Sequence, residues 1–100
     1  MAEFIAFVPR EKAGQAEQRL RSDFDVCAKQ SITVRDAKAL GINKEGSFFY
    51  ITGSEEGVKK CKEFLKEFEA EAKPAEFEHA KKKIVEEQEK AAEGFGGIFG

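Results

Sequence analysis

Two short runs of large apolar residues limit what this chain can fold into. Residues 4–8 (FIAFV) lead into Pro9, and residues 47–52 (SFFYIT) end at Gly53. Successive side chains of a strand point to opposite faces of its sheet, so a strand that is bulky at every position needs cover on both faces. We therefore expect both runs to be strands of a sheet that is buried on both sides.

The segment between these runs has the patterns of a helix and a half-exposed strand. Residues 11–22 are rich in Ala, Gln, Glu, Lys and Arg, which is typical of a surface helix with a narrow apolar stripe. Residues 24–35 alternate between apolar and polar side chains, which predicts a strand with one exposed face and a bend at Gln30.

Two further helical segments begin and end at recognisable residues. Residues 36–41 predict one helical turn, with Asp36 as its N-cap and Gly41 as its left-handed terminator. Residues 54–72 predict the strongest helix of the chain, because Ser54 is a favourable N-cap and apolar residues follow at spacings of three and four.

The C-terminal part is expected to be a charged helix followed by a short tail. Pro74 interrupts the preceding helix, and residues 75–93 carry a thin apolar stripe among Glu and Lys side chains spaced four apart. Residues 94–100 form a Gly/Phe-rich tail. We expect one α+β domain over residues 1–93, because 100 residues is the usual size of a single domain.

The resulting order is strand, helix, strand, strand, helix, helix. From residue 3 to about residue 72 it resembles the β-α-β-β-α order of ferredoxin-like domains, with the charged C-terminal helix in place of, or after, the fourth strand. A right-handed crossover makes the first two strands parallel, with the third strand antiparallel and inserted between them. In the alternative that the sequence leaves open, residues 75–80 form a short fourth strand beside the first.

The second face of this sheet needs cover that the first two helices do not supply. Phe48 and Tyr50 project to one face of their strand, while Phe49 and Ile51 project to the other. The cover is the last helix with its tail, a second copy of the chain, or a ligand. If the last helix packs across the sheet, every aromatic residue is core; otherwise Phe48 and Tyr50 belong to a partner surface.

The tail is the least ordinary part of the chain. It is uncharged and places Phe95, Ile98 and Phe99 among four glycines. Glycine weakens a helix, whereas large apolar side chains are costly to leave in water. We expect these three side chains to dock onto the chain's own sheet or helices, or onto another subunit or protein.

Composition and charge limit which cellular compartment and which classes of partner we expect. The net charge of −2 and the lack of a strongly basic region argue against nucleic acid as the partner. Cys27 and Cys61 lack C-x-x-C spacing and are too few for a disulfide scaffold, which fits a reducing cytoplasm. We expect no membrane span and no signal peptide, because no apolar run is long enough and no basic segment leads into one. The high charged fraction and the absence of Trp resemble proteins of hot environments.

Catalytic constellations are not visible in the sequence. His79 is the only histidine and lies in a charged segment, so we expect a surface residue and no catalytic triad. The glycines do not have the spacing of a phosphate-binding loop. We therefore expect no enzymatic activity, no cofactor and no dedicated metal site.

The sequence leaves two alternative binding functions open. Residues 44–51 (KEGSFFYI) partly resemble the third-strand motif of RNA-recognition domains, although Glu45 and Ser47 depart from it, and this resemblance implies RNA binding through the sheet aromatics. Glu63, Glu67 and Glu71 recur every four residues, which suggests a divalent cation at an acidic surface.

The sequence as a whole favours a small, non-enzymatic binding or assembly module. Its partner is expected to be a second copy of the chain or another protein. The candidate partner-binding residues come from the sheet and the tail: Phe48, Tyr50, Phe95, Ile98 and Phe99.

Overall fold

A computed structural model describes the backbone of residues 1–99 and the side chains of residues 1–91. The described part is a small α+β domain with a three-stranded antiparallel sheet and three α-helices. In chain order the elements are β1 (Ala2–Pro9), α1 (Arg10–Arg21), the 3₁₀ helix η1 (Cys27–Lys29), β2 (Ser31–Asp36), the 3₁₀ helix η2 (Lys38–Leu40), β3 (Gly46–Gly53), α2 (Glu55–Leu65) and α3 (Pro74–Phe99).

The third strand occupies the centre of the sheet. The strand order is β1-β3-β2, and both outer strands run antiparallel to β3. The register places Phe7 opposite Phe48 and Ile5 opposite Tyr50 on one side, with Thr33 opposite Tyr50 on the other. The third strand therefore lies between the first two, where the sequence placed it.

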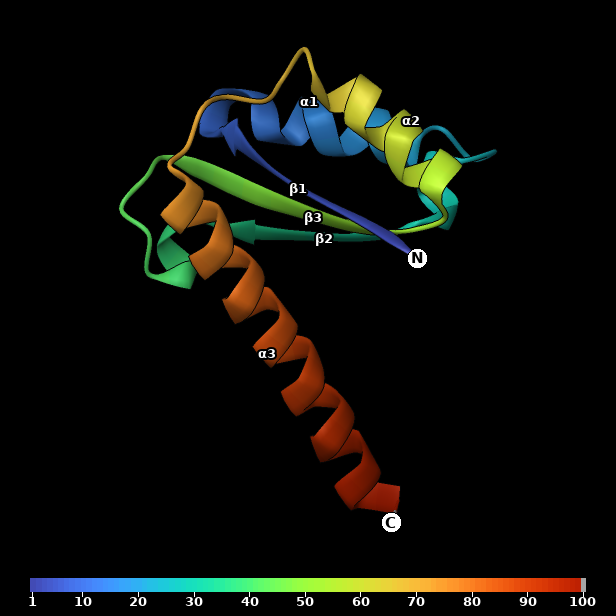
Figure 1. Ribbon diagram of the computed structural model, residues 1–100, viewed down its shortest axis with the longest axis vertical. Helices are drawn as coiled ribbons and strands as arrows, with labels where there is room; N and C mark the ends of the chain where they lie inside the picture. The colour runs from blue at the N-terminus through green and yellow to red at the C-terminus, as the bar shows by residue number, and fades with distance from the viewer. Residues whose placement is uncertain (100) are drawn as a thin grey trace.

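Helices cover both faces of the sheet (Figure 1). The helices α1 and α2 lie over one face and α3 crosses the other. The cluster under α1 and α2 consists of Ala6, Val8, Ala16, Leu20, Cys27, Phe49, Ile51, Val58, Cys61 and Leu65. The cluster on the α3 side consists of Phe7, Ala37, Leu40, Ile42, Phe48, Tyr50, Ala80 and Ile84. The period-two pattern of β3 thus divides its large side chains between two cores.

Several local signals of the sequence act as expected. The Ser54 side chain accepts a hydrogen bond from the Gly57 backbone N–H (3.0 Å), so Ser54 is the N-cap of α2. Gly41 ends η2 with φ of 79°, a left-handed conformation that glycine adopts without strain. The turn begins one residue later than expected, because Ala37 is the N-cap and the Asp36 carboxylate accepts from the Lys38 N–H (3.1 Å).

The prediction of one strand over residues 24–35 is wrong in its first half. The chain turns before η1, and β2 begins only at Ser31. The Asp23 backbone carbonyl accepts from the Ala28 N–H (2.9 Å), and its carboxylate accepts from the Cys27 N–H (3.3 Å). These bonds favour a compact turn over an extended strand, and they place Cys27 in the core.

The helix predicted over residues 54–72 ends earlier, at Leu65. The chain that follows returns to the sheet, because the Ala70 N–H donates to the Phe7 carbonyl (2.8 Å) and forms an isolated antiparallel bridge with β1. A bond between residues so distant in sequence outweighs the local helical pattern. The carboxylates of Glu63, Glu67 and Glu71 therefore do not share one helical face.

The alternative of a short fourth strand at residues 75–80 is wrong, because these residues form the start of α3. Pro74 is the first residue of the helix, where its missing N–H would have no helical partner in any case. The Glu76 carboxylate accepts from the Lys73 backbone N–H (2.8 Å), which satisfies a donor at the helix start. The helix then continues to Phe99, beyond the Glu93 expected from the sequence.

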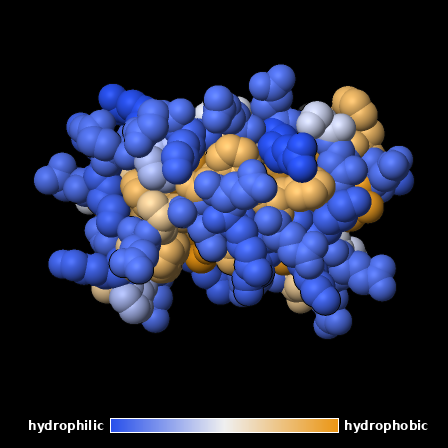
Figure 2. Space-filling model, turned by 90° about the horizontal axis from the view of Figure 1, so that it is seen from above, coloured by the Kyte–Doolittle hydropathy of each residue, from blue (hydrophilic) through white to orange (hydrophobic). Residues whose placement is uncertain are grey.

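The surface over α1 and α2 is mostly hydrophilic, with hydrophobic patches between charged side chains (Figure 2). Phe64 of α2 is half-buried, with the Arg19 guanidinium 4.8 Å and the Lys60 ammonium 5.8 Å from its ring centre. Such cation–π contacts shield part of an aromatic ring from water. Within the described residues, no helix combines the length and the apolar character needed to cross a membrane.

Candidate functional site

The sheet face beneath α3 contains both candidate residues that the sequence placed on β3. Phe48 is 0% exposed, and its ring centre lies 5.1 Å from that of Phe7 and 5.9 Å from that of Phe77 on α3. Tyr50 is 8% exposed. Ala80 and Ile84 complete the contact from the helix. The last helix of the same chain therefore supplies the cover that this face needs.

A three-residue polar cluster joins α3 to the sheet at the margin of this core. The Glu3 carboxylate accepts from the Lys81 ammonium (2.6 Å) and from the Tyr50 hydroxyl (2.7 Å). These hydrogen bonds, Lys81 first, hold the pKa of Glu3 below its ordinary value. Burial and the adjacent Glu3 carboxylate raise the pKa of Tyr50 to about 12. The cluster thus links β1, β3 and α3 through one ionised carboxylate.

We expect Glu3→Gln to lower stability at neutral pH and to have no effect in acid. Because the folded-state pKa of Glu3 is depressed, its contribution is fully present above the unfolded pKa of about 4.5 and is lost as pH falls through the folded pKa. The pair is half-exposed, so the loss at pH 7 is about 0.2–1 kcal/mol. Urea unfolding of both proteins between pH 7 and pH 2 measures the difference. A difference that is constant over this range would contradict the assignment.

Among the side chains of residues 1–91, the contacts of α3 with the sheet continue along the helix as far as Gln88. The Arg35 guanidinium of β2 pairs with Glu87 (2.9 Å), and the Gln88 side-chain amide donates to the Thr33 hydroxyl (3.1 Å). Beyond these contacts the backbone of α3 continues away from the sheet (Figure 1). We call residues 74–88 of α3 the docked half and residues 89–99 the projecting half.

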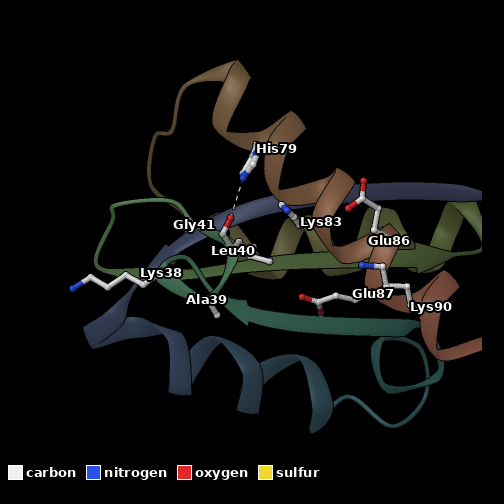
Figure 3. A pocket seen from close by; sticks show the side chains of 9 residues that line it. All are labelled: Lys38, Ala39, Leu40, Gly41, His79, Lys83, Glu86, Glu87 and Lys90. Atoms are coloured by element: carbon white, nitrogen blue, oxygen red, sulfur yellow. Dashed lines mark hydrogen bonds between the residues drawn. The ribbon is translucent and has the colours of Figure 1, made fainter. Parts of the chain in front are cut away.

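A cleft of about 560 Å³ lies between η2 and the docked half of α3. The His79 ring Nε2 lies 2.9 Å from the Leu40 carbonyl oxygen, as the dashed line in Figure 3 shows. A carbonyl only accepts, so Nε2 carries the proton and donates it. The lining residues are Lys38, Ala39, Leu40, Gly41, His79, Lys83, Glu86, Glu87 and Lys90.

The chemistry of this cleft is that of a polar surface with charges of both signs. Lys38 points away from the other lining side chains (Figure 3) and pairs with Glu45 (2.6 Å). Glu87 is engaged by Arg35. The lining residues include no Ser, Thr or Cys, so no hydroxyl or thiol nucleophile stands beside His79. Sequence reasoning expected His79 at the surface and had no signal for its bond to Leu40, which is distant in the chain.

The three tail candidates lie near the C-terminal end of α3. The side chains of Phe95, Ile98 and Phe99 lie outside the described residues, although their backbone belongs to α3. Phe48 and Tyr50 come together under α3, as described above. An RNA base would reach their rings only if α3 left the sheet.

Potential metal ligands do not gather in the described part of the chain. Among the side chains of residues 1–91, no group of three His, Cys, Asp or Glu side chains is placed to hold a metal ion. We find no protein-family model, no curated protein and no solved structure that matches the chain.

Proposed function

We propose that this protein is a small, non-enzymatic assembly module that associates with a second copy of itself through the projecting half of α3. In this proposal the domain is a ferredoxin-like scaffold of the cytoplasm. The strand order β1-β3-β2 and the unlinked thiols of Cys27 and Cys61 support that assignment.

The observation that carries the proposal is the length of α3 relative to its docking site. The helix has 26 residues, which corresponds to about 39 Å. Among the described side chains, those from Phe77 to Gln88 contact the sheet, and the sheet face beneath them is already filled. The projecting half is therefore not needed to cover this sheet.

The sequence of the projecting half is suited to a second helix. Counted in steps of three and four from Ile84 and Gln88, positions 91, 95, 98 and 99 follow on one side of α3. Three of these positions are Phe or Ile, which are costly to leave in water. A second copy offers the same stripe, so two helices can pair about a two-fold axis. Glu89, Lys90 and Glu93 supply both charge signs beside the stripe.

Light scattering tests the proposal by the solution mass of four proteins. We expect the full chain to be a dimer, and the chain ending at Glu93 and the Phe95→Asp/Phe99→Asp variant to be monomers, because both remove the apolar stripe. Lys82→Asp is the matched control, since Lys82 is an exposed residue of the docked half, and it should remain a dimer.

The melting temperature separates this proposal from its main rival. If the full chain and the chain ending at Glu93 are both monomers and truncation lowers the melting temperature, the tail belongs to the chain's own core. That result would contradict self-association.

A further inference from the structure

Two cysteines that are distant in sequence meet in the core beneath α2. Cys27 of η1 and Cys61 of α2 are each 0% exposed and belong to the same buried cluster. The 3₁₀ helix η1 packs against α2 in this cluster, and the two thiols are not joined by a disulfide. The segment between them contains β2, η2 and β3, so a bond between the two sulfurs would close a loop that includes two of the three strands.

Contacts at the first end of η1 hold Cys27 against α2. The Asp23 carboxylate accepts from the Cys27 N–H (3.3 Å) and pairs with the ammonium of Lys60 (3.4 Å). Lys60 directly precedes Cys61 on α2. One carboxylate therefore joins the two backbone segments that carry the thiols.

The side-chain amide of Gln30 holds the other end of η1. Its nitrogen donates to the Val26 carbonyl (2.9 Å), and its oxygen accepts from the Ser54 N–H at the start of α2 (3.1 Å). A methyl group at Gly57 would overlap this amide, so the glycine leaves room for the amide in its present position. Both ends of η1 are thus tied to α2, and the position of Cys27 relative to Cys61 is strongly constrained.

We propose that Cys27 and Cys61 are a modification site: an oxidant of the small-molecule disulfide class, such as oxidised glutathione, converts them into an intramolecular disulfide that fastens η1 to α2. The two thiols lose two protons and two electrons as the sulfur–sulfur bond forms. Oxidised glutathione accepts them and is released as two molecules of reduced glutathione. A surplus of reduced glutathione reverses the reaction by the same exchange.

The site reacts only when the core opens, because neither sulfur is accessible in the folded domain. Burial also raises the pKa of both thiols, which disfavours the attacking thiolate. Oxidation is therefore expected during folding or during a local opening of α2, and slowly in the intact domain. Once formed, the disulfide is reduced only slowly in the closed domain, because reduced glutathione reaches it through the same opening of the core.

Refolding the full chain from denaturant in a mixture of oxidised and reduced glutathione tests the proposal. After the remaining thiols are blocked, the intact mass should fall by two hydrogen masses relative to the reduced protein, with no attached glutathione. Peptide mapping should join Cys27 to Cys61. The oxidised protein should melt about 10 °C above the reduced protein, because closing a loop of this length disfavours the unfolded chain. Folded protein given the same mixture should react more slowly.

Two variants serve as controls, Cys27→Ala and Cys61→Ala. In each, no intramolecular disulfide can form, so the rise in melting temperature under oxidising conditions should disappear. The remaining thiol should stay free or carry glutathione. The comparison is made within each variant, so a general loss of stability does not affect it. If a variant fails to fold, the mass and peptide map of the wild type still decide.

Three results would overturn the proposal. The first is a wild type that keeps two free thiols or carries glutathione on both after refolding. The second is cross-linking between chains in place of the intramolecular bond. The third is a disulfide form that melts below the reduced form.

Discussion

Replacing Phe48 with alanine is expected to lower the free energy of unfolding by about 3–5 kcal/mol. Phe48 is fully buried between β3 and α3, and its ring packs against the rings of Phe7 on β1 and Phe77 on α3. The substitution removes this apolar surface and leaves a cavity that the sheet and α3 cannot easily close. The free energy of unfolding of such domains is about 5–15 kcal/mol, so this substitution should remove a large part of it.

Urea denaturation at pH 7 measures this loss, with Phe64→Ala as the matched control. Phe64 of α2 is the same residue type, but it is only half-buried where it packs against the cluster under α1 and α2. Its truncation should cost about 1–2 kcal/mol, since less of its surface is removed from water on folding. Equal losses for the two variants would show that α3 does not pack on Phe48 as described.

The second large effect is expected at Gly46, where alanine should destabilise the domain by about 1–3 kcal/mol. A methyl group there would lie 2.4 Å from the Val8 carbonyl oxygen and 2.6 Å from the Phe7 ring. The carbonyl belongs to the backbone of β1, which is paired with β3 along its length, so it cannot move aside alone. The two strands must separate locally, and the Phe7 ring must also shift.

Gly14 offers the same substitution with the opposite expected sign. It lies in α1 with no atom within 4 Å of the position that a methyl group would take. Alanine should therefore stabilise the domain by about 0.5–1 kcal/mol, through the higher helix propensity of alanine. Thermal unfolding of both variants gives the comparison. Stabilisation by Gly46→Ala would refute the close approach of β1 to residue 46.

Patterns within short stretches of the sequence were sufficient to predict much of this fold. The runs at residues 4–8 and 47–52 predict β1 and β3, because a short run that is apolar at every position is typical of a strand buried on both faces. Ser54 and Gly41 marked element ends through bonds and dihedral angles within a few residues. The position of the third strand between the first two followed from the handedness of crossovers.

The errors lie where a distant contact outweighs a local pattern. The alternation near residues 26–29 is typical of a strand. The hydrogen bonds of Asp23 and the packing of α2 instead make this segment a turn and a 3₁₀ helix. The stripe after Leu65 has helical spacing, yet Ala70 pairs with Phe7 instead. A periodic pattern indicates which side chains share a face. It does not indicate which backbone groups form hydrogen bonds with distant segments of the chain.

The sequence by itself determined that both faces of β3 must be covered and that the C-terminal tail carries apolar residues that are costly to leave in water. Only the tertiary structure decided what covers Phe48, which carbonyl binds His79, and that Cys27 meets Cys61. The physical reason is that the tendency of a side chain to be buried depends mainly on its own type, whereas a contact depends on two residues from distant parts of the chain. The packing of α2 and α3 on the sheet brings such residues together.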